Sequence, residues 1–200
     1  ELLEDGDDPA AERHLDRALR LQPEYSEAHD GKGRVLFHRG ELVAAEKSFR
    51  RAIDANPSYA VAWNHLGFVI EQQGKLDEAA EACGRAVELD PQLVEALNNL
   101  GSVCVRRGDL DEGVGHFRGA IRGMPNNPAI HQNLGTALMA LGRMEEAVAS
   151  YQRALRLDPD LFIPHSRLGL LLFRFWRLQA GLLSRHLGGF LRAAPPEMFG

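Results

Sequence analysis

The stretch 60–91 reads AVAWNHLGFVIEQQGKLDEAAEACGRAVELDP, and it decides how the rest of the chain is interpreted. Apolar residues recur in it at helical spacing in two blocks, 60–72 and 76–88. Gly74 separates the two blocks, and a glycine permits a tight turn there. The stretch ends at Pro91, into which a helix cannot easily continue. The sequence therefore predicts a hairpin of two antiparallel helices.

This unit recurs along the chain with a fixed period of 34 residues. Its terminal proline returns at that spacing as Pro23, Pro57, Pro91, Pro125 and Pro159. A fixed period of this length predicts a stacked-repeat architecture, in which each unit buries its apolar face against its neighbours.

The residues inside the unit resemble the tetratricopeptide repeat (TPR), whose pattern asks for Trp, Leu, Gly, Tyr, Gly, Ala, Phe, Ala and Pro. The corresponding residues here are Trp63, Leu66, Gly67, Ile70, Gly74, Ala79, Cys83, Ala86 and Pro91. The match extends over roughly residues 8–170. The resemblance implies an all-α fold, a right-handed TPR solenoid of stacked antiparallel helix hairpins, with about ten helices.

The fidelity of the pattern predicts three regions. Residues 1–25 are expected to form a partial repeat with only its second (B) helix, and 26–161 four whole TPR repeats. Residues 162–200 are expected to form a degenerate fifth repeat or a C-terminal capping or docking segment. Because the chain starts at Glu1 in mid-repeat, we expect it to be a fragment of a longer protein.

Two segments depart from the pattern. The third whole repeat carries four glycines in or beside its B helix, and each interior glycine costs roughly 1 kcal/mol relative to alanine. This indicates either a tolerated soft helix or a hinge; the glycines are Gly113, Gly115, Gly119 and Gly123. The segment 161–192 mixes leucines and aromatic residues such as Phe175 and Trp176 with arginines. We expect a cap or docking face there, with self-association (a homo-oligomer) and membrane-surface contact as alternatives.

Composition excludes several classes of function. Acidic residues exceed basic ones by 28 to 23, and the net charge of −5 argues against nucleic acid as the main partner. Cys83 and Cys104 occupy core positions of the repeat, so we expect small buried hydrophobes in a reducing, cytoplasmic setting. No run of about 18 apolar residues marks a membrane span.

No catalytic constellation or cofactor motif is found, so the sequence predicts a protein that is not an enzyme, with no catalytic residue, cofactor or metal. His29, His131 and His165 share one place in the first (A) helices of three repeats. Packed helices of successive repeats lie roughly 10 Å apart, whereas zinc ligands lie about 2.0–2.2 Å from one ion. We therefore expect these histidines to replace the usual aromatic or apolar residue rather than to bind zinc.

Polar side chains next to each Leu-Gly pair form the candidate peptide-binding groove. The set is Asn64, His65, Asn98, Asn99, Gln132, Asn133 and Arg167. It resembles the asparagine ladder of the O-GlcNAc transferase TPR superhelix, which implies a groove whose amides hold an extended peptide backbone. A carboxamide has both a donor and an acceptor, so it can pair with both groups of a peptide unit. The alternative is that these residues serve solubility or hydrogen bonding between helices.

The predicted function is a protein–protein interaction scaffold that binds a peptide or protein segment in the concave groove of its A helices. One alternative is the recognition arm of a multidomain enzyme such as a glycosyltransferase, and another is a self-assembling TPR scaffold. The TPR clamp that holds chaperone C-termini would need lysine at Asp30 or Asn64 and asparagine at Arg34 or Phe68. These residues are missing, which argues against chaperone-tail binding.

Overall fold

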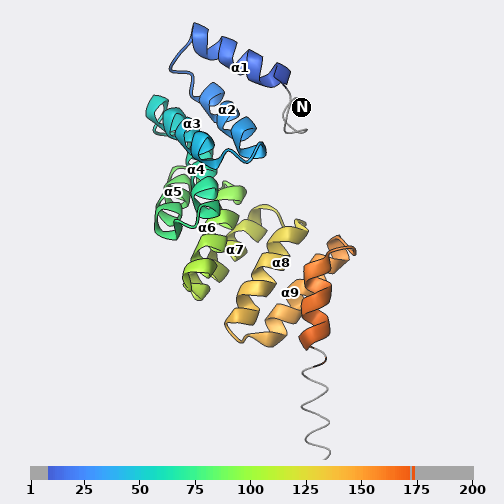
Figure 1. Ribbon diagram of the computed structural model, residues 1–200. Coiled ribbons are helices and arrows are strands. Elements are labelled where there is room, and N and C mark those ends of the chain that lie inside the picture. Colours follow the sequence, from blue (N-terminus) through green and yellow to red (C-terminus); the bar gives the residue numbers. More distant parts are fainter. Residues whose placement is uncertain (1–8, 172, 174–200) are drawn as a thin grey trace, which may run out of the picture.

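The computed structural model describes residues 9–171 and 173, and in that range every regular element is an α-helix (Figure 1). A further helix covers residues 162–171 and includes residue 173. The helices with fully described bounds are α1 (Pro9–Leu21), α2 (Ser26–His38), α3 (Leu42–Ala55), α4 (Ala60–Gln72), α5 (Leu76–Leu89), α6 (Val94–Arg107), α7 (Leu110–Gly123), α8 (Pro128–Ala140) and α9 (Met144–Leu157).

The helices form hairpins α2/α3, α4/α5, α6/α7 and α8/α9, each closed by a glycine. Gly40, Gly74, Gly108 and Gly142 have φ of 79°, 81°, 97° and 77°. This left-handed region is strained for residues with a Cβ atom, which explains why the turn position holds glycine in all four hairpins. The predicted role of Gly74 as the turn residue is confirmed.

The hairpins stack in chain order, as Figure 1 shows. Successive A helices (α2, α4, α6 and α8) contact one another directly, whereas among α1–α9 the B helices α3, α5, α7 and α9 contact only A helices. Because the A helices lie closer together than the B helices, the stack curves with the A helices on its concave side. The predicted all-α solenoid of stacked antiparallel hairpins is confirmed.

Each hairpin is held by a B-helix side chain that lies against a glycine of its A helix. A Cβ atom added at Gly33 would lie 2.6 Å from the ring of Phe49, and one at Gly101 would lie 2.8 Å from the ring of Phe117. The other two pairs are Gly135 with Tyr151 and Gly67 with Cys83. These glycines are therefore required by close packing, since the space of their side chain is already filled.

Lys32 stands where the TPR pattern has leucine, and the structure gives the reason. Its Nζ atom donates a 2.6 Å hydrogen bond to Oδ1 of Asp16 on α1. A second ion pair, Arg39 with Glu12 at 2.8 Å, joins the same two helices. The first A helix therefore holds its preceding helix partly through charge where later repeats use apolar packing.

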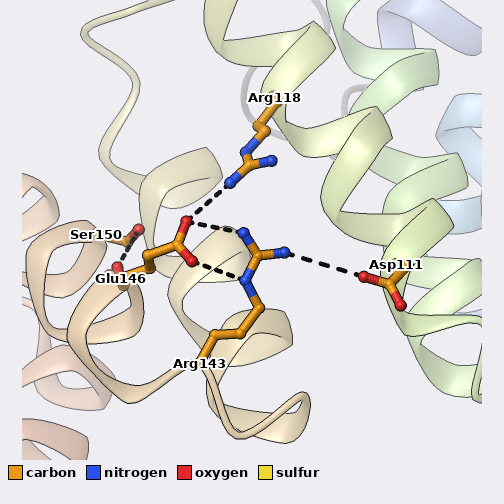
Figure 2. Close-up of polar contacts among 5 residues, drawn as sticks. All are labelled: Asp111, Arg118, Arg143, Glu146 and Ser150. Carbon is orange, nitrogen blue, oxygen red and sulfur yellow. Dashed lines mark hydrogen bonds and ion pairs between the residues drawn. The ribbon is translucent and has the colours of Figure 1, made fainter.

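An ion-pair network joins the third and fourth hairpins on the B-helix side (Figure 2). Glu146 of α9 accepts hydrogen bonds from Arg143 at 2.7 and 2.9 Å and from Arg118 of α7 at 2.9 Å. Asp111 of α7 lies 3.9 Å from Arg143 on the other side of the guanidinium. Hydrogen bonds from Arg143, together with the charge of Arg118, hold the pKa of Glu146 below its ordinary value.

The first prediction concerns how the stability of the chain depends on pH. Because the folded-state pKa of Glu146 is lowered, its contribution to stability is fully present above the unfolded-state pKa of about 4.3. That contribution is lost as the pH falls through the folded-state value. We expect Glu146→Gln to lower the urea midpoint at pH 7, and the difference from the unaltered chain to shrink in acid. The exposed neighbour Glu145→Gln is the control, and equal effects of the two changes at pH 7 would contradict the network's role.

The proposed division into 1–25, 26–161 and 162–200 remains a prediction. The segment 174–200, which includes Phe175 and Trp176, lies outside the described residues, as do 1–8 and 172. In the described part of the last helix, Phe162 is 79 % exposed and Phe173 is 57 % exposed.

Candidate functional site

The predicted groove residues meet in pairs across successive A helices. Asn99 of α6 donates from Nδ2 to Oδ1 of Asn64 on α4 over 2.9 Å. Asn133 of α8 donates in the same way to Asn98 on α6 over 3.0 Å. The two partners of each hydrogen bond are 35 residues apart, one more than the repeat length. The reason is that the residue directly before the leucine of one repeat bonds to the residue two positions before the leucine of the preceding repeat. We call these pairs rungs.

A third rung, at the N-terminal end of the row, has different chemistry. Nδ1 of His65 lies 2.7 Å from Oδ1 of Asp30 on α2, again over 35 residues. Asp30 is only 4 % exposed. Sequence reasoning did not place Asp30 in the groove. The signal was available, because Asp30 precedes Asn64 by one repeat length.

The predicted residues differ in how far they reach the surface. Asn64 is 5 % exposed and faces inward as a rung acceptor. Arg167, on the last helix, is exposed. The others are half-buried: His65, Asn98, Asn99, Gln132 and Asn133. A carboxamide offers two donors and an acceptor oxygen with two lone pairs, so one rung bond leaves most of this capacity unused.

A fourth contact between A helices of neighbouring repeats lies near their C-terminal ends, next to the turns of the hairpins. Nη1 of Arg106 on α6 donates to both Oε1 and the backbone oxygen of Glu71 on α4, at 3.0 and 3.1 Å. Glu71 is 6 % exposed, so its charge is paired where it is buried. Sequence reasoning missed this pair, although the two opposite charges have the same separation of 35 residues as the rungs.

Aromatic side chains occupy the N-terminal part of the A-helix side. Phe37 of α2 and Phe68 of α4 meet edge to face, with ring centroids 5.3 Å apart, and the ring of Phe49 lies 5.4 Å from that of His65. A cavity of about 170 Å³ lies among these rings, bordered also by Arg34, His38 and Val69. Sequence reasoning missed this cavity. Its signal was an aromatic residue at 68, where later repeats have Ser102 and Thr136.

A half-buried phenol, Tyr59, lies close to the N-terminal rung. Burial, and then the negative charges of Asp30 and Glu27, raise the pKa of Tyr59 to about 12. Its hydroxyl therefore stays protonated at neutral pH and offers a hydrogen atom beside the acidic end of the groove.

The histidines considered and rejected as zinc ligands make a recurring bond between repeats. Trp63 donates from Nε1 to the carbonyl oxygen of Pro57 at 2.9 Å. His29, His131 and His165 place Nε2 at 2.8–2.9 Å from the carbonyl oxygens of Pro23, Pro125 and Pro159. The expectation that these histidines replace the aromatic residue of the pattern is confirmed, and they also reproduce its hydrogen bond.

The comparisons with known proteins agree with the repeat fold. Two repeat profiles match the chain, one described as tetratricopeptide repeat over residues 1–60, 44–94 and 71–128, and one described as TPR repeat over 135–174. The chain belongs to the tetratricopeptide repeat family. Proteins of this family are typically non-catalytic scaffolds, which supports a role in protein interaction. A search of curated proteins found no match.

Solved structures with a similar fold include two TPR proteins. A crystal structure of MamA aligns with a TM-score of 0.66 at 23 % identity, covering 74 % of this chain and 86 % of that chain. A crystal structure of YrrB, described as a TPR protein with an unusual peptide-binding site, aligns with a TM-score of 0.66 at 24 % identity, covering 78 % and 81 %. Within the described residues of this TPR chain, none of the helices has the length and hydrophobicity to cross a membrane.

Proposed function

We propose that the concave face of this TPR chain binds an extended segment of another protein. The observation that carries the proposal is the row of half-buried carboxamides Asn98, Asn99, Gln132 and Asn133, which follows the A helices along the stack. The rungs hold Asn98, Asn99 and Asn133 in place, and these carboxamides keep unused hydrogen-bonding capacity. They favour a ligand that presents alternating donors and acceptors, which is what a peptide backbone does.

The spacing of the rungs suits an extended chain. Successive A helices are separated by roughly 10 Å, and an extended strand rises about 3.3 Å per residue. One rung therefore serves about three ligand residues. Because the rungs contact backbone atoms, they bind with little dependence on the ligand's sequence. The same logic underlies the resemblance to the O-GlcNAc transferase ladder, and the peptide-binding site described for YrrB supports peptide binding by this fold.

We assign the choice among ligand sequences to the aromatic cavity at the N-terminal end of the groove. A cavity of about 150 Å³ is enough to hold a benzene ring, and the cavity here is about 170 Å³. Its walls include Phe37 and Phe68, while Arg34 and His38 border it with polar nitrogen atoms. The cavity therefore favours an apolar or aromatic ligand side chain, followed by an acidic group near the rim.

The second prediction tests the rungs. The double change Asn99→Ala and Asn133→Ala removes the donor of two rungs and their ligand-facing amides. Each lost bond costs about 1–3 kcal/mol, so we expect peptide affinity to fall by about 30-fold or more while helical content is kept. Peptides recovered by pulldown with the whole chain serve as the probe in a calorimetric titration. Gln152→Ala, an exposed carboxamide on the B helix α9, is the control.

A chemically altered ligand makes this test sharper. The same peptide with N-methylated backbone amides keeps its side chains but loses the N–H groups that would donate hydrogen bonds to the carboxamide oxygens. We expect the unaltered chain to bind it as weakly as the double variant binds the original peptide. Full affinity of the double variant, or equal loss in Gln152→Ala, would show that the ligand lies elsewhere.

A further inference from the structure

Three side chains in the third hairpin bring different ligand atoms together. The Sγ atom of Cys104 on α6, a carboxylate oxygen of Glu112 and a ring nitrogen of His116, both on α7, lie within 4.8 Å of one another. Glu112 and His116 are one helical turn apart, so they share one face of α7. Cys104 is 3 % exposed, whereas Glu112 is exposed. The group therefore sits at the edge of the core, where solutes can reach it.

The ring of His116 has an unexplained polar atom. Its Nε2 atom is buried and has no hydrogen-bond partner among the described residues. The nearest acidic atom, Oε1 of Glu112, is 3.6 Å away, too far for a hydrogen bond. A buried polar atom without a partner is costly and rare, and it calls for an explanation.

We propose that Cys104, Glu112 and His116 bind a zinc ion, with water as the fourth ligand. Zinc takes thiolate, imidazole and carboxylate ligands in tetrahedral geometry at about 2.0–2.3 Å, which places neighbouring ligand atoms about 3.3–3.6 Å apart. The separation of 3.6 Å between His116 and Glu112 is long for a hydrogen bond but fits two atoms bound to one ion. The Sγ atom of Cys104 lies no more than 4.8 Å from the other two ligand atoms, so the trio has to close by about 1.2 Å at most. Rotation of the exposed Glu112 side chain and of the His116 ring can supply this movement, while the buried Cys104 stays in place.

Two members of the trio are particular to this hairpin, whereas Glu112 has glutamate counterparts in Glu78 and Glu146. Cys104 corresponds to the core residues Ile70 and Leu138, and His116 to Ala82 and Ser150. The backbone is also adapted here. Where the other repeats have alanine, this one has Gly113, and a Cβ atom there would lie 2.9 Å from the backbone oxygen of Gly101 and 2.7 Å from a methyl group of Val105. The glycine brings α7 close to α6 beside the trio.

The charges around the trio favour a cation. The carboxylates of Glu112 and Asp109 both act electrostatically on the Cys104 thiol. Arg107, whose positive charge also acts on this thiol, is already engaged by Asp77 at 3.4 Å and Asp109 at 3.2 Å. Zinc binding converts the thiol to a thiolate and releases its proton to solvent, so affinity rises with pH. The bound ion would link α6 to α7 in the hairpin that contains the most glycine.

The test is a titration of the full chain with Co²⁺, which occupies zinc sites and reports thiolate binding by a charge-transfer absorption. We expect this absorption to saturate at one ion per chain and to disappear when Zn²⁺ is added. Cys104→Ser should abolish it, whereas the matched control Cys83→Ser should retain it, because Cys83 is the other buried thiol. His116→Ala should weaken Co²⁺ binding by about tenfold or more, and His38→Ala should leave it unchanged.

Two further measurements keep the test independent of folding. Glu112→Gln changes an exposed residue, so its helical content should be unaltered while Co²⁺ affinity falls by about tenfold. Zn²⁺ should raise the unfolding temperature of the unaltered chain and of Cys83→Ser, but not of Cys104→Ser. The proposal is overturned if the unaltered chain shows no charge-transfer absorption at millimolar Co²⁺, or if the absorption persists in Cys104→Ser.

Discussion

Replacing Phe49 with alanine is expected to unfold the α2/α3 hairpin before the rest of the solenoid. The ring of Phe49 is 1 % exposed, lies against Gly33 and belongs to the cluster that joins the first two whole hairpins. Truncation of a buried phenylalanine costs about 3–5 kcal/mol, because the lost burial is added to the cost of a cavity. In a stacked-repeat protein this loss falls mainly on the affected unit and its neighbours.

Amide hydrogen exchange tests this prediction, because it measures protection separately in each helix. In Phe49→Ala we expect protection to fall most in α2 and α3, with α8 and α9 close to their original rates. Phe162→Ala is the matched control, because Phe162 is 79 % exposed and its loss should change stability by no more than about 0.5 kcal/mol. A uniform loss of protection along the chain would mean that the solenoid unfolds as one unit.

Gly67→Ala and Gly84→Ala are expected to change stability in opposite directions. A Cβ atom at Gly67 would lie against the sulfur of Cys83, 3.0 Å from its backbone nitrogen and 3.2 Å from the backbone oxygen of Ala79. Backbone atoms cannot move aside as a flexible side chain can, so we expect a loss of about 1–3 kcal/mol. A Cβ atom at Gly84 has nothing within 4 Å, and helix propensity alone predicts a gain of about 1 kcal/mol.

Urea unfolding of the two glycine variants measures this difference. Both substitutions add one methyl group to the α4/α5 hairpin, so composition and the location in the chain are matched. The expected result is a lower midpoint for Gly67→Ala and a higher one for Gly84→Ala. If both variants shifted in the same direction, close approach of α4 and α5 would not be what requires glycine at position 67.

The fold was accessible from the sequence because its determinants are local and periodic. The A helix predicted at 60–72 is α4 (Ala60–Gln72), and the B helix predicted at 76–88 is α5 (Leu76–Leu89), one residue longer. Gly74 has the positive φ that a two-helix turn demands, and such a requirement can be read directly from residue type.

The arrangement of the candidate site was less accessible, because it depends on the axial offset between helices of different repeats. Sequence position grouped Asn98 with Asn99, whereas the structure pairs Asn99 with Asn64 and Asn133 with Asn98. Likewise, sequence reasoning tested for zinc among histidines at one repeated place. It missed His116, which lies near Cys104 on the facing helix α6 and near Glu112 one turn earlier on α7.

The bond from a ring nitrogen to the proline carbonyl has a consequence for repeats that use histidine in place of tryptophan. A carbonyl oxygen can only accept, so Nε2 of His29, His131 and His165 carries the hydrogen, and the neutral ring is the Nε2–H tautomer. The exchange of indole for imidazole therefore keeps a ring N–H donor at the same junction between repeats, although the two rings differ in size.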